Sequence, residues 1–171
     1  GPNGAGKTTV FNLLTNVYQP TRGTIMLDGK STARKTTAQV SKMGIARTFQ
    51  NIRLFADMSV IDNVKVGLHN SIHQPLAASI THLFGYRKSE KQSREEALEL
   101  LDFFNMADLA HHQAGSLPYG EQRRLEIARA LATHPGIILL DEPAAGMNPS
   151  ETSELMENIR RIRDKFHIAV M

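Results

Sequence analysis

The sequence predicts an α/β fold in which helices cover a parallel β-sheet. A glycine-rich loop with the pattern G-x-x-x-x-G-K-T occupies residues 1–8, and a helical repeat of apolar residues follows it directly. An unbroken apolar run, Ile-Ile-Leu-Leu at residues 137–140, is typical of a strand that is buried on both faces. The chain has 171 residues, of which 41% are hydrophobic, so it can build one substantial core.

The first third of the chain predicts a helix followed by short elements. Apolar residues recur at helical spacing over residues 7–18, and a turn at residues 20–23 ends that segment. The next elements are expected in this order: a strand at 24–27, a turn at Asp28-Gly29, a helix at 36–42 and a strand at 44–49.

Four further helices are predicted by apolar periodicity and capping patterns. Ser59 followed by Asp62 three residues later is a capping pattern, so a helix is expected to begin there. Asn148, with proline at the next position and Glu151 at the third, marks the start of a long helix over residues 149–166. Amphipathic helices are also expected at 93–104 and 120–133.

The remaining segments are less regular. Residues 70–93 mix polar residues, proline and glycine with short apolar patches, which predicts an insertion or a mobile connection. A buried strand normally precedes a loop of the kind found at residues 1–8, and residues 167–171 have the pattern of a strand that has only begun. We therefore expect the chain to be an internal fragment, truncated at both ends.

Composition excludes several classes of function. The chain has no cysteine, which excludes disulfide frameworks, zinc–thiolate sites, iron–sulfur clusters and thiol nucleophiles. Its 20 basic and 17 acidic residues give a net charge of +3 and are scattered, so charge alone does not indicate a nucleic-acid partner. No apolar run approaches the ~20 residues that a membrane-spanning helix requires.

The loop at residues 1–8 predicts a phosphate site. Its glycines allow backbone N–H groups to surround phosphate oxygens at the N-terminus of a helix. In this pattern Lys7 reaches the β- and γ-phosphates and the Thr8 hydroxyl binds Mg²⁺. The alternative is an ordinary glycine-rich turn, which the lysine, the threonine and the following helix disfavour.

Two carboxylates, Asp141 and Glu142, follow the buried strand. In a nucleotide hydrolase, the first would hold Mg²⁺ and the second would act as the base for an attacking water. A solvated acidic turn is the alternative when this motif is taken alone.

Two polar segments complete the candidate site. Residues 117–124 open a helix with small and polar residues, and so offer a second group of free backbone N–H donors. A second group of phosphate-binding N–H donors would have a role if two chains share each nucleotide. The alternative is that residues 117–124 are an ordinary helix start. Gln50 follows a predicted strand, where its amide could contact both Mg²⁺ and water, although its spacing alone marks only a polar loop residue.

The order of these motifs resembles that of ABC transporter ATP-binding subunits. The segments GPNGAGKTT, TFQ, LPYGEQRRLEIARAL, IILLDEP and AAGMN are similar to the Walker A, Q-loop, signature, Walker B and D-loop motifs. Within that family, RTFQNIRLF, YGEQRRLEIARA and DEPAAGMNP most resemble the ATP-binding subunits of Liv-type branched-chain amino acid importers. The resemblance implies a P-loop NTPase fold, with a RecA-like core at 1–50 and 134–171 and an inserted helical subdomain at 51–133.

The resemblance also implies a role for each matching residue, with ATP and Mg²⁺ as cofactors. Glu142 is the expected general base, assisted by Lys7 and Gln50, and the expected Mg²⁺ ligands are Thr8, Gln50 and Asp141. Residues 145–148 match the loop between two subunits. The residues expected to bind nucleotide are Gly1, Asn3, Gly4, Ala5, Gly6, Lys7, Thr8 and Thr9 in Walker A, and Tyr119, Gly120 and Glu121 toward the partner chain's ATP.

The family implies partners and a location as well. These are the coupling helices of membrane permease subunits, a second ATP-binding subunit and, indirectly, a periplasmic binding protein, at the cytoplasmic face of the inner membrane. Two residues depart from the family pattern: Pro118 replaces the usual serine and Glu121 the usual glutamine. The aromatic residue that stacks on adenine and the switch histidine of the family have no counterpart within residues 1–171.

Other functions remain open or are disfavoured. The alternatives within the family are ATPases for urea import or for lipid and lipopolysaccharide export, and a non-transport ABC ATPase that acts on DNA or ribosomes. No N-K-x-D tetrapeptide occurs, which disfavours a guanine nucleotide. His69 and His73 are spaced as metal ligands, but no glutamate lies between them and no third ligand is evident.

Overall fold

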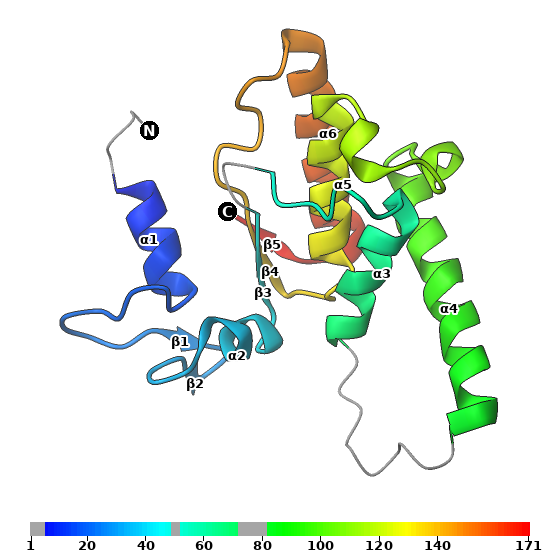
Figure 1. The fold of residues 1–171 in the computed structure, drawn as a ribbon. Helices are drawn as coiled ribbons and strands as arrows, with labels where there is room; N and C mark the ends of the chain where they lie inside the picture. The colour runs from blue at the N-terminus through cyan, green and yellow to red at the C-terminus, as the bar shows by residue number, and fades with distance from the viewer. Residues whose placement is uncertain (1–5, 49–51, 72–81) are drawn as a thin grey trace.

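The computed structural model describes residues 6–48, 52–71 and 82–171, and Figure 1 shows how they are arranged. The helices are α1 (Lys7–Leu14), α2 (Thr37–Lys42), α3 (Val60–Ser71), α4 (His82–Phe103), α5 (Tyr119–Leu131) and α6 (Pro149–Phe166). The strands are β1 (Met26–Leu27), β2 (Lys30–Ser31), β3 (Ile45–Arg47), β4 (Ile137–Leu139) and β5 (Ala169–Val170). Among these residues, no helix is both long and apolar enough to cross a membrane.

The central sheet is parallel, with β4 between β3 and β5. Ile45 pairs with Ile137, and Ile137 pairs with Ala169 on the other side. The prediction of a buried strand at residues 137–140 is therefore confirmed, and the patterns at 44–49 and 167–171 correspond to its two neighbours. Because all three strands run the same way, their carboxyl ends lie at one edge of the sheet.

Helices cover both faces of this sheet, as Figure 1 shows with α1 on one side and α5 and α6 on the other. Successive residues of β4 point to opposite faces. Leu139 packs in a small cluster with Phe11 of α1, whereas Ile138 packs in the larger cluster with residues of α5 and α6. This three-layer arrangement confirms the α/β class.

The larger core extends away from the sheet between α3, α4 and α5. Its buried side chains include Val64, Leu68, Leu101 and Leu125, each at most 2% exposed. Gly67 allows α3 to lie close to α5: a Cβ there would overlap the Arg129 carbonyl oxygen and lie 2.8 Å from the Ala132 Cβ. The helical packing thus depends on a residue without a side chain.

Several helix ends match the sequence prediction closely. The Asn148 side chain accepts a hydrogen bond from the Glu151 N–H at 2.9 Å, and Glu151 accepts one from the Asn148 N–H, so α6 begins with a complete capping box. At α3, the Ser59 hydroxyl accepts a hydrogen bond from the Asp62 N–H at 3.2 Å. Both predicted caps are therefore confirmed.

Two helices differ from the predicted bounds. Helix α1 ends at Leu14 rather than near residue 18, because Asn16 adopts a left-handed backbone (φ 56°) and donates a hydrogen bond to the Lys35 carbonyl at 3.1 Å. Helix α4 begins at His82 rather than at residue 93, so part of the segment predicted to be irregular is helical.

The predicted Asp28-Gly29 turn is confirmed. Both residues have positive φ values, which are those of a type I′ turn between β1 and β2.

Candidate active site

The N-terminus of α1 presents free backbone donors. Gly6 is its N-cap residue with a left-handed backbone (φ 75°, ψ 12°), and no side chain caps it among the residues described. Lys7, Thr8 and Thr9 form the first turn and are exposed. The free N–H groups and the helix dipole suit a phosphate here. The predicted loop residues Gly1, Asn3, Gly4 and Ala5 lie outside the described part of the chain.

Lys7 faces the carboxylate that follows β4. Its Nζ atom lies 3.6 Å from Oε1 of Glu142, and the two side chains are 42% and 36% exposed. Because the pair is open to solvent, it contributes little to stability. It does show that the lysine of the loop and the strand-end carboxylate line the same space. Glu142 also has a left-handed backbone (φ 48°), which is uncommon for a residue other than glycine and occurs often at functional sites.

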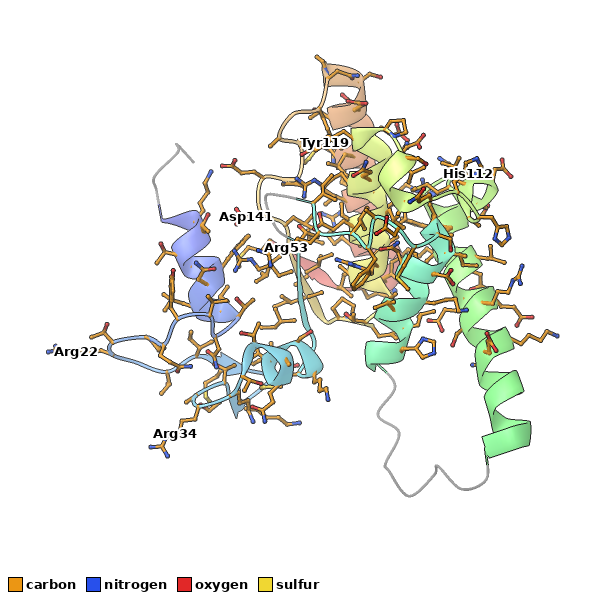
Figure 2. All side chains as sticks on the ribbon, in the orientation of Figure 1. Arg22, Arg34, Arg53, His112, Tyr119 and Asp141 are labelled. Carbon is orange, nitrogen blue, oxygen red and sulfur yellow. The ribbon has the colours of Figure 1, made fainter. Side chains whose placement is uncertain are left out.

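Asp141 is buried beside this pair and is held by an arginine. It is 6% exposed, and its Oδ2 atom lies 3.3 Å from Nη2 of Arg47. The same guanidinium donates a hydrogen bond to Oδ1 of Asn12 on α1 at 2.7 Å. Figure 2 shows Asp141 on the side of the sheet that faces α1. The arginine therefore joins the ends of β3 and β4 to the helix that carries the phosphate loop.

Sequence reasoning missed Arg47, although strand register could have found it. Arg47 pairs with Leu139 in the parallel ladder, and Asp141 lies two residues beyond Leu139. Residues two apart share one face of a strand. Once β3 and β4 are known to be neighbours, a charged residue at position 47 is therefore expected to lie close to the Asp141 carboxylate.

Gln50 lies outside the described residues, but the chain before it is placed. The Thr48 N–H donates a hydrogen bond to the Leu139 carbonyl at 2.9 Å, which extends the pairing by one residue beyond β3. Thr48 is therefore at the same edge of the sheet as the residues that follow β4. The role of Gln50 stays a prediction.

A second free helix N-terminus is formed by α5. Pro118 is its N-cap residue, without a side-chain cap among the described residues, and Tyr119 is 44% exposed. A Cβ on Gly120 would lie 3.1 Å from Oε1 of Glu151, so a larger residue has little room there. A Cβ on Gly146 would lie 3.6 Å from the Tyr119 ring. The segment predicted to face a partner's nucleotide thus lies beside the loop at residues 145–148, and Figure 2 shows Tyr119 away from Asp141.

A buried ion pair connects α5 to the segment that follows residues 49–51. Arg123 is fully buried, and its Nη1 atom lies 2.8 Å from Oε2 of Glu126. The other Glu126 oxygen accepts a hydrogen bond from the Arg53 N–H at 3.3 Å. Arg129 donates a hydrogen bond to the Arg53 carbonyl, and burial lowers the pKa of the Arg129 guanidinium, while the Glu126 carboxylate raises it by less. The two contacts to Arg53 could not be predicted from the sequence, because they join segments more than 70 residues apart.

The described residues fit Mg²⁺ only as a partner of a bound phosphate. The Thr8 hydroxyl and the Asp141 carboxylate are oxygen donors, which this ion prefers. No cluster of three histidine, cysteine or acidic residues that could hold a metal occurs in the part of the chain that is described. Mg²⁺ commonly takes its remaining ligands from phosphates and water. His69 belongs to no such cluster among the described residues, and His73 lies outside them.

Known proteins are similar to this chain in sequence and in fold. The ABC transporter family profile matches residues 1–145. The chain is 44% identical over 171 residues to the high-affinity branched-chain amino acid transport ATP-binding protein BraF of Pseudomonas aeruginosa. It is 43% identical to the LivG protein of the same description from Escherichia coli. In both cases the match covers 100% of this chain and 67% of the relative, so the chain spans about two thirds of their length.

Solved structures agree with this match. A nucleotide-free ATP-binding cassette from an ABC transporter superposes with a TM-score of 0.79 at 30% identity, covering 99% of this chain and 66% of that one. An ABC transporter cassette in its ADP conformation gives a TM-score of 0.80 at 31% identity, with the same coverage. A dimeric cassette bound to ADP and Pi gives 0.79 at 26% identity, covering 99% of this chain and 70% of that one.

Proposed function

Because the chain belongs to the ABC transporter family, we propose that it binds and hydrolyses ATP to drive an importer of branched-chain amino acids. The observation that carries this proposal is the 3.6 Å approach of Lys7 to Glu142, beside the buried Asp141. It brings a phosphate-binding lysine and two strand-end carboxylates to one edge of a parallel sheet. Nucleotide sites of α/β proteins form at such edges.

Each side chain then has a defined task. The N–H groups at the start of α1 and the Lys7 ammonium bind the β- and γ-phosphates. Thr8 and Asp141, with Gln50, would hold Mg²⁺, which neutralises phosphate charge when bound. Glu142 accepts the proton of the attacking water as general base, and its side chain is exposed enough to reach that water.

A second ATP-binding subunit completes the site in this proposal. The uncapped start of α5 and the exposed Tyr119 form a surface with free N–H donors, suited to a γ-phosphate held by the partner. The lack of space at Gly120 supports a requirement for bare backbone there. One structural relative is itself a dimeric cassette bound to ADP and Pi. Nucleotide would join two subunits, and hydrolysis would release them.

A permease is the proposed partner on another surface. A groove of about 290 Å³ lies between β3, α3 and α5, with Phe55, Val66, Glu126 and Arg129 among its lining residues. It combines apolar and charged groups, as a site for a short cytoplasmic helix of a membrane protein would. We place the chain at the cytoplasmic face of the inner membrane, with a periplasmic binding protein as an indirect partner. The helical subdomain proposed for residues 51–133 contains much of this groove.

Substrate choice rests on the relatives. Both BraF and LivG are described as branched-chain amino acid transport proteins, and they match the whole chain. A phosphonates import ATP-binding protein from Staphylococcus saprophyticus is less similar, at 34% identity. Branched-chain amino acids are therefore favoured over other ABC cargoes.

Two experiments test the proposal. Equilibrium dialysis with Mg-ATP should show saturable binding, which Lys7→Ala weakens roughly 10- to 100-fold, since a hydrogen bond to a charged group contributes about 1.5–3 kcal/mol. Lys30→Ala, on the exposed hairpin strand β2, is the control and should bind normally. Vesicles that contain the cognate permease should then accumulate labelled leucine only with ATP inside. Absence of ATP binding would overturn the hydrolase, and ATP-driven uptake of a different solute would overturn the cargo.

A further inference from the structure

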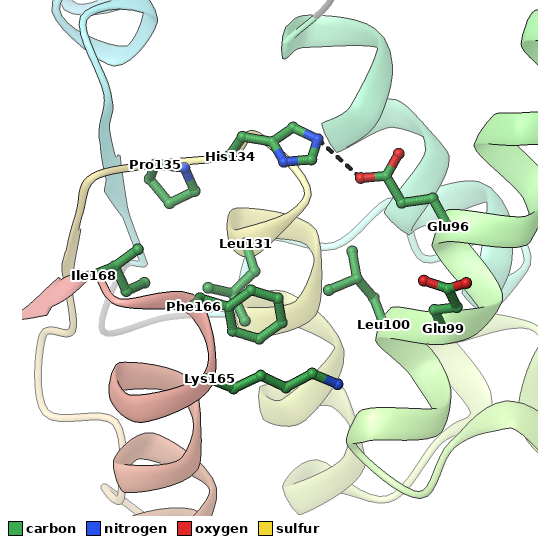
Figure 3. A pocket seen from close by; sticks show the side chains of 9 residues that line it. All are labelled: Glu96, Glu99, Leu100, Leu131, His134, Pro135, Lys165, Phe166 and Ile168. Carbon is green, nitrogen blue, oxygen red and sulfur yellow. Dashed lines mark ion pairs between the residues drawn. The ribbon is translucent and has the colours of Figure 1, made fainter.

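A pocket of about 310 Å³ lies outside the nucleotide site, between α4, the end of α5 and the end of α6 (Figure 3). Ligand sites for small molecules begin at about this size. Residues from three separate segments contribute to it. They are Glu96, Glu99 and Leu100 from α4, Leu131, His134 and Pro135 from the end of α5, and Lys165, Phe166 and Ile168 from the end of α6 and beyond.

The floor of this pocket is apolar. Leu100, Leu131 and Ile168 are 7%, 5% and 9% exposed and belong to the larger core. Phe166 is 36% exposed, and Figure 3 shows its ring standing in the middle of the pocket. An aliphatic group placed over these side chains would therefore be removed from water on several sides.

Two opposite charges face the pocket without pairing with each other. Neither Glu99 nor Lys165 has an ion-pair partner among the described residues. Figure 3 shows the Lys165 side chain crossing the pocket toward α4, with the Glu99 carboxylate on the opposite wall. The Lys165 Nζ atom lies 5.1 Å from the ring centre of Phe103 and 5.8 Å from that of Phe166, so two aromatic faces hold the ammonium in place.

The two other polar side chains of the lining, Glu96 and His134, already contact each other. His134 Nε2 lies 2.9 Å from Oε1 of Glu96, and this contact closes one side of the rim (Figure 3). His134 lies three residues beyond the end of α5 and has a left-handed backbone (φ 51°), at the bend where the chain leaves the helix. One carboxylate and one ammonium therefore remain to receive a ligand.

We propose that this pocket binds a neutral aliphatic α-amino acid. Its ammonium group would pair with Glu99, its carboxylate with Lys165, and its side chain would cover Leu100, Leu131 and Phe166. Glu99 and Lys165 are both exposed in the free protein, so a ligand with only one charge would form one of these two contacts and would bind more weakly than a ligand that forms both. The charges of the lining disfavour a polyphosphate, because two carboxylates face the pocket with a single lysine.

Only the choice of leucine as the ligand rests on the proposed function. The bound amino acid would contact α4 and α6 at once, so it would favour the relative position of the two helices found here. If leucine is the cargo, the leucine concentration on the ATPase side of the membrane would determine how much of the ATPase has leucine bound. It would therefore also determine how strongly this position of α4 and α6 is favoured.

The test is an NMR titration of the protein with ¹³C-labelled leucine and isoleucine methyl groups. We expect unlabelled L-leucine to cause saturable shifts at Leu100, Leu131 and Ile168. Isoamylamine lacks the carboxylate and 4-methylpentanoate lacks the ammonium group, so each should bind at least about tenfold more weakly. Equal binding of 4-methylpentanoate would overturn the amino-acid site and identify an apolar groove instead.

Variants separate the two charged contacts. Glu99→Gln and Lys165→Met should each weaken L-leucine binding at least about tenfold while the methyl spectrum stays native. Lys91→Met is the control, since Lys91 is 79% exposed on α4 and pairs with Glu95 away from the pocket. No saturable shift, or equal affinity in all three variants, would overturn the proposal.

Mg-ATP binding is measured on the same samples. If Mg-ATP binds and leucine does not, this inference alone is overturned. If leucine binds and Mg-ATP does not, the proposed hydrolase alone is overturned.

Discussion

The guanidinium of Arg47 and the carboxylate of Asp141 form a buried ion pair, with Nη2 and Oδ2 3.3 Å apart and side chains 7% and 8% exposed. Arg47 also donates hydrogen bonds to Asn12 at 2.7 Å and to the Thr15 hydroxyl at 3.4 Å. Its guanidinium lies 5.6 Å from the centre of the Phe11 ring. One side chain thus connects a proposed metal ligand, two strands and α1.

Removing the arginine should destabilise the fold strongly. Arg47→Ala leaves Asp141 buried without a counter-ion, which is expected to cost about 3–5 kcal/mol in the free energy of unfolding. Urea denaturation measures this change. Arg160→Ala is the control, because Arg160 is 65% exposed and pairs with Glu157 on the surface of α6, where a change within about 0.5 kcal/mol is expected.

A double variant shows whether charge or packing is responsible. Arg47→Met with Asp141→Leu removes both charges and keeps apolar volume, so it should recover most of the lost stability, as buried pairs replaced by apolar residues often do. A double variant as unstable as Arg47→Ala would instead show that the hydrogen bonds to Asn12 and Thr15 dominate.

The cap of α6 gives a smaller, local prediction. Asn148→Ala removes the side-chain acceptor for the Glu151 N–H and should lower the free energy of unfolding by about 1 kcal/mol. Ser153→Ala on the same helix is the control, since its exposed hydroxyl only bonds the Pro149 carbonyl four residues before it. Equal losses in the two variants would mean that the cap does not contribute.

Local patterns explain which parts of the fold the sequence could predict. Asn148 and Glu151, or Ser59 and Asp62, interact across three residues, so spacing alone identifies the helix starts. The strand at β4 followed from four consecutive apolar residues. The start of α4 was missed because its first eight residues, HLFGYRKS, mix one glycine, one histidine and one serine with a short apolar patch, whereas the structure begins the helix at His82.

Contacts between distant segments could not be predicted in the same way. Arg47 contacts Asp141 only because β3 and β4 are neighbours in the sheet. The sequence of a single strand does not indicate which strand lies beside it. Arg123 and Glu126 have the spacing of an ordinary surface ion pair on a helix. In the structure both are buried, and the Glu126 carboxylate accepts a hydrogen bond from the Arg53 N–H. Motif order compensated for this at the candidate site, since it identified Lys7, Asp141 and Glu142 before any contact was known.

Gly67 offers a test of the close contact between α3 and α5. Alanine in place of glycine inside a helix normally stabilises it by about 0.5–1 kcal/mol. Here the added Cβ would overlap the Arg129 carbonyl oxygen, so Gly67→Ala should instead destabilise the protein by about 1–3 kcal/mol. The change is measured by thermal or urea unfolding.

Gly136→Ala is the matched control for this steric argument. A Cβ at Gly136 would meet only the Gly44 carbonyl oxygen, at 3.9 Å, which is an ordinary contact distance. This variant should unfold like the parent protein. A stabilising effect of Gly67→Ala would contradict the close packing of α3 on α5.

The proposed general base gives the sharpest functional prediction. Glu142→Gln keeps the shape of the side chain but removes its ability to accept a proton from water, so ATP hydrolysis should fall about 10²- to 10⁴-fold. Binding should persist, because the phosphates are held by Lys7 and the N–H groups of α1. Replacing the carboxylate also removes the Lys7 ion pair at 3.6 Å, which leaves the lysine freer to bind a phosphate, so affinity for Mg-ATP is expected to be equal or higher.

Phosphate release by the assembled transporter measures ATP hydrolysis, and equilibrium dialysis measures Mg-ATP binding separately. Glu157→Gln, 62% exposed on α6, is the control for loss of a carboxylate. Normal turnover by Glu142→Gln would remove Glu142 from the reaction and leave the base to be sought elsewhere.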